Sequence, residues 1–216
     1  MATMTIRGCM DFALQLLNQY SIAGALVPLS YNDQADAENR MINLINDAQM
    51  EIATTVRPID ELQDYIVPEV PINTPLEDIV CEVPEDYYRH EAMYFTPLKG
   101  RVRVMIDAAH YKWIGEHTLL LPNKPAGTYT MQYCRYPHRY EADVDKDTPL
   151  DNTPDTHEII PYYVAAMIAL DENPKAYYAL YNVWETRLSR LGMKAPHAVS
   201  TLVQDVYGFD NFRGLW

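Results

Sequence analysis

The sequence is poor in the residues that build common catalytic motifs. Its eight glycines are scattered, so it contains no phosphate-binding glycine loop, no dinucleotide-binding fingerprint and no nucleophile elbow. His157-Glu158 begins like the zinc-protease motif HExxH, but Pro161 stands where the second histidine is needed. His90-Glu91 fails in the same way at Tyr94. We therefore predict that the chain is not an enzyme and needs no cofactor.

Cysteines and long apolar runs are also scarce. Cys9, Cys81 and Cys134 are far apart, odd in number and in no CxxC pair, which favours buried free thiols over a disulfide framework or a zinc site. No apolar run approaches the roughly 20 residues that cross a bilayer, so we expect no membrane association. The first residues lack the apolar core of a signal peptide, and we expect the chain to be made in a cytosol.

Basic residues are outnumbered by acidic ones. There are 17 Lys and Arg against 30 Asp and Glu, a formal net charge of -13. A groove that grips nucleic acid needs clustered Lys and Arg, so tight nucleic-acid binding is excluded as the main function. A surface that repels phosphate remains compatible with DNA that slides past without sticking.

Two stretches near the start have the periodicity of amphipathic helices. The first covers about Cys9 to Tyr20. The second begins at Asn32 or Asp33 and ends at Arg57-Pro58, because proline disfavours a helical conformation in the residue before it. Apolar residues in the second stretch recur at three- and four-residue steps, at Met41, Leu44, Ile45, Ala48, Ile52 and Val56.

A helical hairpin is predicted over Thr153 to Gly192. Thr153 can cap the first helix with Pro154 in its first position, and Asn173-Pro174 repeats that signal for the second helix, which ends at Gly192. The apolar stripes are Ile159, Tyr163, Ala166, Met167 and Leu170, then Tyr177, Leu180, Tyr181, Trp184, Leu188 and Leu191.

The middle of the chain has the pattern of strands. Prolines recur between residues 58 and 84, and no helical period lasts there. Arg101 to Ile106 alternates, and residues 111–115 and 118–122 resemble a hairpin around Gly115-Glu116. Residues 127–136 form the clearest strand, in which Tyr129, Met131 and Tyr133 share one face. These features predict an antiparallel β-domain of four to six strands.

An acidic loop leads from the β-domain to the hairpin. Its aspartates Asp143, Asp145, Asp147 and Asp151 imitate the start of a calcium loop. Thr148 stands where that loop needs glycine, and Pro154 where it needs glutamate. A solvated acidic face is therefore favoured over a metal site. The spacing of His110, His117 and His138 likewise fits no zinc pattern.

The last eight residues contain four large apolar side chains, although chain ends are normally polar. Burying one such side chain contributes about 1.5–3 kcal/mol, so we expect this tail to dock. It either folds back on its own chain or inserts into another protein. The residues that would make the contact are Val206, Tyr207, Phe209, Phe212, Leu215 and Trp216.

These segments predict a mixed α+β protein. Residues 1–57 and 153–192 would form a discontinuous antiparallel helical bundle. Residues 58–152 would form an inserted antiparallel β-domain with the acidic loop, and residues 193–216 an extended docking tail.

The order of the segments resembles that of the head–tail adaptor proteins of tailed bacteriophages. The similarity is carried by the run Ile160-Pro-Tyr-Tyr-Val-Ala-Ala-Met-Ile-Ala-Leu-Asp-Glu-Asn-Pro174, by Trp184-Glu-Thr-Arg-Leu188, by Val83-Pro-Glu-Asp-Tyr-Tyr-Arg89 and by Gly127-Thr-Tyr-Thr-Met-Gln-Tyr133 with Tyr136-Pro137. It extends from about Thr5 to Leu191 and departs from the smallest adaptors in its larger β-insertion.

The resemblance implies a structural virion protein at the neck of the capsid, assembled in the host cytoplasm. Such proteins form a ring, usually a dodecamer, beneath the portal protein, extend the DNA channel and receive a stopper or tail protein. The tail residues from Val206 to Trp216 would then grip the portal. The aspartates of the acidic loop would line or flank a channel through which double-stranded DNA passes without specific binding.

Two other functions fit the sequence. One is a different neck or tail component, such as a tail terminator, with the same helices. The other is a carbohydrate-binding or metal-dependent module in the β-domain, suggested by 17 tyrosines and three tryptophans. Many of these aromatic residues lie on predicted helical stripes or on one strand face, where core or subunit contacts are the commoner use.

Overall fold

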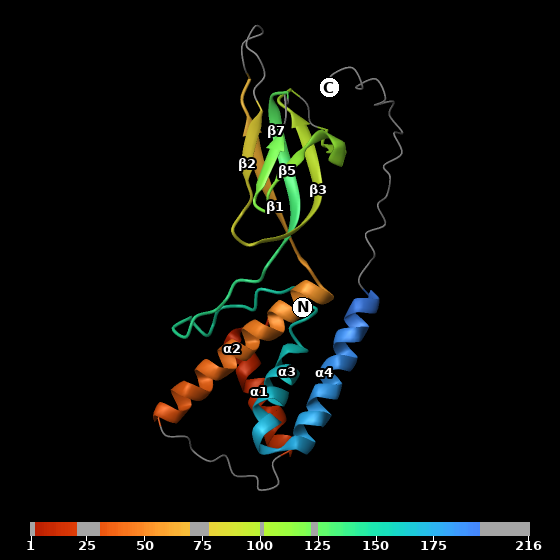
Figure 1. Cartoon of the computed structure of the whole chain (residues 1–216). Helices are drawn as coiled ribbons and strands as arrows, with labels where there is room; N and C mark the ends of the chain where they lie inside the picture. Colours follow the sequence, from red (N-terminus) through yellow and green to blue (C-terminus); the bar gives the residue numbers. More distant parts are fainter. Residues whose placement is uncertain (1–2, 21–30, 70–77, 100–101, 122–124, 195–216) are drawn as a thin grey trace. The chain divides into compact units, whose positions relative to one another are not determined.

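The computed structural model describes residues 3–20, 31–69, 78–99, 102–121 and 125–194. The chain divides into two compact units, one of residues 1–59 and 136–195 and the other of residues 60–135. The first unit contains the helices and the second contains two antiparallel sheets. The predicted α+β class is therefore confirmed, with helices from both ends of the chain in one unit and strands from its middle in the other (Figure 1).

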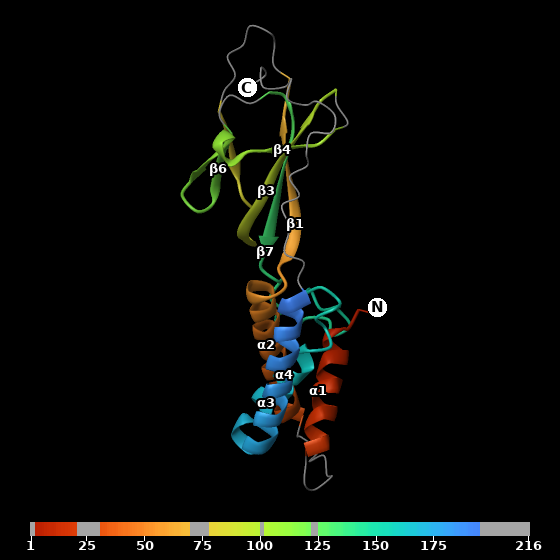
Figure 2. The same ribbon diagram turned by 90° about the vertical axis from the view of Figure 1, so that its right-hand side faces the viewer.

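The helical unit is built around its third helix. Its elements are α1 (Ile6–Tyr20), α2 (Tyr31–Thr55), α3 (Ile160–Glu172) and α4 (Pro174–Lys194). Helix α3 packs against each of the other three (Figure 2). Most of its circumference is therefore buried, at Ile160, Val164, Ala165, Ala166 and Ala169. A single apolar stripe was expected, and Leu170 at the end of that stripe is 43% exposed.

Helix α3 begins later than the sequence predicted. The cap at Thr153 with Pro154 is wrong, because residues 153–159 form turns in which Thr156 and Ile159 donate backbone bonds to Thr153 and Thr156. The helix starts at Ile160, with Pro161 in its first turn. The second cap is confirmed, since the Asn173 side chain accepts the Ala176 N–H at 3.2 Å. Helix α4 then continues two residues past Gly192.

One apolar core fills the helical unit. It joins residues of all four helices with Tyr140 and Leu150, which lie outside the helices. Trp184 of α4 is fully buried, and its ring centroid lies 5.1 Å from that of Tyr163 in α3. The predicted stripe of α2 is largely confirmed, because Met41, Ile45, Ala48 and Ile52 are buried. The aromatic residues of the α3–α4 hairpin thus pack into the core of the helical unit, with Tyr163, Tyr177 and Tyr181 beside Trp184.

The β unit consists of seven strands in the described residues, more than predicted. A four-stranded sheet has the order β1-β7-β3-β4, with β1 at Ile59–Val67, β7 at Gly127–Arg135, β3 at Tyr87–Pro97 and β4 at Val104–Ile106. A three-stranded sheet has the order β2-β6-β5, with β2 at Ile79–Glu82, β6 at Thr118–Leu121 and β5 at Lys112–Ile114. Strand β4 is shorter than the alternation from Arg101 predicted.

Residues of both sheets share one core. Tyr129, Met131 and Tyr133 of β7 point into it together, which confirms the predicted face of that strand. Met93 and Phe95 of β3 join them from the same sheet, and Leu119 and Leu121 of β6 from the other. The predicted hairpin around Gly115 is also confirmed, because β5 and β6 pair antiparallel and Gly115 has a φ of 70° that favours glycine.

Candidate functional site

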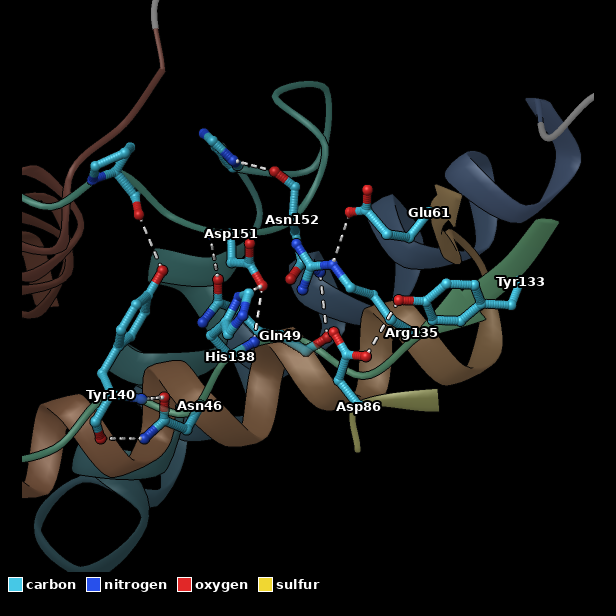
Figure 3. Close-up of polar contacts among 12 residues, drawn as sticks. Asn46, Gln49, Glu61, Asp86, Tyr133, Arg135, His138, Tyr140, Asp151 and Asn152 are labelled. Atoms are coloured by element: carbon cyan, nitrogen blue, oxygen red, sulfur yellow. Dashed lines mark hydrogen bonds and ion pairs between the residues drawn. The ribbon is translucent and has the colours of Figure 1, made fainter. Parts of the chain in front are cut away.

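Residues 136–159, here called the anchored loop, are fastened to the helices. The sequence grouped residues 136–152 with the β-insertion, whereas the structure places them in the helical unit. Asn46 of α2 pairs with Tyr140 as a strand neighbour would: its side-chain NH2 donates to the Tyr140 carbonyl and its oxygen accepts the Tyr140 N–H, both at 2.9 Å (Figure 3). Asn46 is buried, so these bonds satisfy groups that water does not reach.

Gln49, one turn later on α2, holds the other end of the anchored loop. Its side-chain oxygen accepts the backbone N–H of Asp151 at 2.9 Å, and its backbone oxygen accepts the side-chain NH2 of Asn152 at 3.1 Å. Gln49 is fully buried and Asn152 nearly so. Two amide side chains of one helix thus fix a loop about 100 residues away in sequence, although Nε2 of Gln49 and Oδ1 of Asn152 are buried with no hydrogen-bond partner among the described residues.

The N-terminal segment closes over the same loop. Met4 donates its backbone N–H to Nδ1 of the buried His157 at 3.1 Å, and Nε2 of His157 then donates to the Asn152 carbonyl at 2.7 Å. Backbone bonds run from Leu150 to Met4 and from Ile6 to Thr148. His157 therefore works as a structural link between two segments.

Three of the four predicted acidic-face residues are exposed. Asp143, Asp145 and Asp147 lie on the surface, where Asp147 accepts a bond from the Arg7 side chain at 3.0 Å. The Asp151 side chain is only 16% exposed. It accepts the backbone N–H of His138 at 2.7 Å and lies 3.1 Å from Nδ1 of the His138 ring. Lys146 pairs with Glu38 of α2. The loop displays these carboxylates and Lys146 faces the helices, while Arg139 of the same loop is exposed. The role predicted for the aspartates beside a DNA channel stays a prediction.

The predicted tail contacts fall outside the described residues. Val206, Tyr207, Phe209, Phe212, Leu215 and Trp216 all lie beyond Lys194, the last residue of α4. Their proposed contact with a portal protein therefore stays a prediction.

The side of the four-stranded sheet away from the core, here called the outer face, is a surface that sequence reasoning missed. The Thr130 hydroxyl of β7 donates to Asp64 of β1 at 2.5 Å, and the Tyr94 hydroxyl of β3 donates to Gln132 at 3.1 Å. These bonds place Asp60, Leu62, Asp64 and Ile66 on the outer face by strand alternation. The sequence signal for this face was the two-residue alternation of side chains along β1, but the prolines that flank the strand obscured that pattern.

A polar cluster occupies one end of the outer face. The thiol of Cys134 donates to Glu91 at 3.1 Å, and Arg89 pairs with Glu91 at 2.6 Å. Burial, then the bond to Glu91, raises the pKa of Cys134 to about 12. Partial burial by itself raises the pKa of Glu91, but bonds from Cys134 and Arg89 bring it below its usual value. Cys134 is thus a neutral thiol and a poor nucleophile at neutral pH.

An aromatic cluster lies on the other side of β3. His90 Nε2 and the Tyr111 hydroxyl are 2.7 Å apart, and the rings of His90 and Trp113 meet edge to face at 5.7 Å. Tyr87 stacks on Tyr133 and also contacts Trp113. The rings pack against one another at the edge of the β-unit core. This packing differs from a sugar-binding platform, in which a broad ring face is open to the ligand.

The described residues show neither a metal-binding cluster nor a membrane-spanning helix. No group of three or more His, Cys, Asp or Glu side chains there is placed to hold a metal ion. No described helix is both long and apolar enough to span a bilayer. Of the three histidines considered in the sequence, His110 and His117 lie in the β unit and His138 in the helical unit. The three described cysteines are free and buried, as predicted.

Comparison with known proteins gives little beyond these observations. No protein-family model matches the chain, and no curated protein matches it. One similar solved structure is a chain from the virion of a native gene transfer agent particle, with a TM-score of 0.28 and 11% sequence identity. The match covers 80% of this chain and 87% of that chain. A TM-score this low carries no conclusion about fold or function.

Proposed function

We propose that the chain is a structural protein of a tailed-phage virion and, more specifically, the head–tail adaptor that forms a ring beneath the portal. The observation that carries the proposal is the build of the helical unit. Its helices come from both ends of the chain, and a β unit of residues 60–135 is inserted between them. This order, with an Asn-Pro turn joining α3 to α4, is the order that resembles the adaptor family.

The surface charges support a role beside DNA that must move. Within residues 141–147 of the anchored loop, Glu141, Asp143, Asp145 and Asp147 are exposed, whereas Lys146 pairs with Glu38; the exposed Arg139 lies just before this acidic stretch. A wall that presents carboxylates repels phosphate and opposes adhesion. In the proposed ring these side chains line or flank the passage. A ring whose lumen is lined by Lys and Arg would contradict this part of the proposal.

The tail supplies the contact with the portal. Helix α4 ends at Lys194, and the chain continues for 22 residues that finish with Phe212, Leu215 and Trp216. Trp184 and Leu180 are buried in the helical core together with residues of the other three helices. In the proposed assembly the apolar tail side chains enter a portal subunit, with about 1.5–3 kcal/mol for each one buried.

The decisive experiment combines the full chain with the portal protein of the same virus and examines the product by electron microscopy and native mass spectrometry. The expected result is a closed ring of copies on the portal. The chain that lacks Phe209–Trp216 should remain folded by circular dichroism and should lose portal binding. The control is the double variant Thr201→Ala/Gln204→Ala, which changes polar tail positions and should keep binding.

Three results would contradict the proposal or one of its parts. A chain that sits elsewhere in the neck, for example at the top of the tail tube, would be another neck component such as a tail terminator. Full portal binding by the truncated chain would show that the tail is not the portal contact. Specific binding on a glycan array, abolished by Trp113→Ala, would instead favour a carbohydrate-binding role for the β unit.

A further inference from the structure

The four-stranded sheet ends in two edges of opposite character. Strand β1, with nine residues, forms one edge and β4, with three residues, forms the other. Asp60 meets Cys134 and Asp64 meets Thr130, so β1 runs antiparallel to β7. Strand β3 is antiparallel to both β7 and β4. An edge strand leaves a row of main-chain groups available for another strand.

On the outer face, the β1 edge carries acidic side chains that alternate with exposed apolar ones. Asp60, Leu62, Asp64 and Ile66 alternate along it with residues of the other face, of which Tyr65 and Val67 join the core. Leu62 is 52% exposed and Ile66 is 76% exposed. Glu61, on the same edge, is also exposed and pairs with Arg135 at 3.4 Å. Acidic side chains on an edge discourage indiscriminate pairing and leave room for a basic partner.

The β4 edge is basic and apolar on the same face. Met105 is opposite Tyr94 in the register, and Tyr94 belongs to the outer face, so Met105 does too. Met105 is 64% exposed. The guanidinium of Arg103 lies 5.0 Å from the centre of the Tyr94 ring, which places it on this face as well. Lys99 is exposed in the turn that follows β3.

We propose that the β1 edge of one copy pairs with the β4 edge of a second copy, so that the outer faces form one continuous surface. In the antiparallel register that sets Leu62 against Met105, Asp64 meets Arg103. Strands β1 and β4 run in opposite directions within a copy, so the pairing is antiparallel when neighbours are related by rotation about an axis along the strands.

The use of two different edges makes this contact head-to-tail. Each copy keeps one edge of each kind, and such a contact closes into a ring or continues without end. The inference deepens the proposed function, because it names a contact between ring neighbours. Strand β4 is short, so each contact contributes few main-chain hydrogen bonds. Closure of a ring compensates, because every copy is then held at two edges.

Site-specific cross-linking tests the pairing in the full chain. The native thiols Cys9, Cys81 and Cys134 are buried, so single exposed cysteines can be introduced as reporters. A mixture of Leu62→Cys and Met105→Cys chains, treated with a short bis-maleimide, should give a covalent dimer, and neither variant alone should. The matched control is a mixture of Val80→Cys and Ile114→Cys, which are exposed apolar positions on the two edges of the other sheet.

The cross-linking outcomes are decisive in each direction. A dimer from Leu62→Cys chains alone would mean symmetric β1–β1 pairing and would overturn the proposal. Equal cross-linking by the control mixture, or none by any mixture in concentrated free chain and in portal-bound chain, would overturn it too. A ring on the portal without this cross-link removes the inference and leaves the proposed function intact. A cross-link without any portal binding would support the edge pairing and remove the proposed function.

Charge reversal gives a second, independent test. Asp64→Lys places two basic side chains at the Asp64–Arg103 contact, and Arg103→Glu places two acidic side chains there. Neither variant should assemble alone. In their equimolar mixture, opposite charges meet again wherever the two variants are neighbours, so the mixture should assemble with alternating copies. Native mass spectrometry on variants of different mass would resolve this alternation. Assembly by either folded variant alone, or no recovery in the mixture of folded variants, would contradict the pairing.

Discussion

The two units of this chain handle polar groups in opposite ways. The helical unit buries amide and imidazole side chains, notably Asn46, Gln49 and His157, and each binds a distant backbone segment. The β unit keeps its core apolar and aromatic and places carboxylates on its outer face and β1 edge. The helical unit is thus closed within one chain, whereas the β unit presents edges that suit assembly.

The largest expected loss of stability comes from a substitution in the core of the helical unit. Trp184→Ala removes a fully buried indole, and such truncations cost about 3–5 kcal/mol. Chemical denaturation followed by circular dichroism at 222 nm should show this loss. Tyr178→Ala on the same helix is the control, because that side chain is 65% exposed and should change stability by less than about 0.5 kcal/mol. Equal losses would mean that Trp184 is not a core residue.

The counterpart in the β unit is Gly127→Ala. A Cβ atom there would lie 2.5 Å from a Phe95 ring carbon and 2.5 Å from the Thr96 carbonyl oxygen. Such crowding typically costs about 1–3 kcal/mol. Hydrogen exchange should show faster opening of β3 and β7, with the helices unchanged. At Gly115 the Cβ would meet open space, so Gly115→Ala should cost only about 1 kcal/mol, from its φ of 70°.

A change at Asn46 tests whether the buried amides hold the anchored loop. Asn46→Ala leaves the Tyr140 N–H and carbonyl without their partner, with an expected loss of about 1–3 kcal/mol. Proteolysis should then cut within residues 136–152. Asn43→Ala, an exposed position on the same helix, should leave the cleavage rate as it is in the parent chain. Protection of the loop in the Asn46 variant would show that the apolar contacts of Tyr140 and Leu150 suffice.

A pH effect should appear in the β unit. Burial lowers the pKa of His90 from 6.5, although Glu91 opposes the shift. The unfolded chain therefore binds a proton more readily, so this contribution to stability is complete above about pH 6.5 and is lost as the pH falls through the lower folded value. Thermal unfolding at pH 7.5 and 5.5 should show the loss, and His90→Gln should reduce it. The lowered carboxylate pKa values of Glu91 and Asp155 affect more acidic conditions.

The smallest effect concerns the acidic loop. Arg7 and Asp147 form an ion pair in which both side chains are more than half exposed. Solvent screens an ion pair this exposed, so Arg7→Ala should barely change the unfolding midpoint. A clear fall of the midpoint would show that this ion pair helps to hold the anchored loop.

Local patterns were sufficient to predict much of the secondary structure. The Asn173-Pro174 junction, the α2 stripe and the face of β7 all follow from neighbours in sequence, and the structure confirms them. The start of α3 was missed because Thr153-Pro154 carries the same cap signal as a real start. The turns from Thr153 to Ile159 are set by distant partners instead: His157 binds Met4, and Asp155 binds Arg57.

The candidate surfaces depend on contacts that sequence patterns do not encode. Asn46 and Tyr140 are 94 residues apart, and nothing at either position marks the other. The membership of residues 136–152 in the helical unit follows from such pairs. The acidic and basic edges of the sheet likewise emerge only when the strand order places β1 and β4 at opposite ends.

The split of the helical unit between the two ends of the chain has a consequence for synthesis on the ribosome. Helices α1 and α2 emerge first, but α3, which covers their apolar sides, begins about 100 residues after α2 ends. At roughly 5–20 residues per second, that delay lasts on the order of 5–20 s. The β unit can fold in that interval, while the nascent α2 stripe stays exposed to chaperones and to other nascent chains.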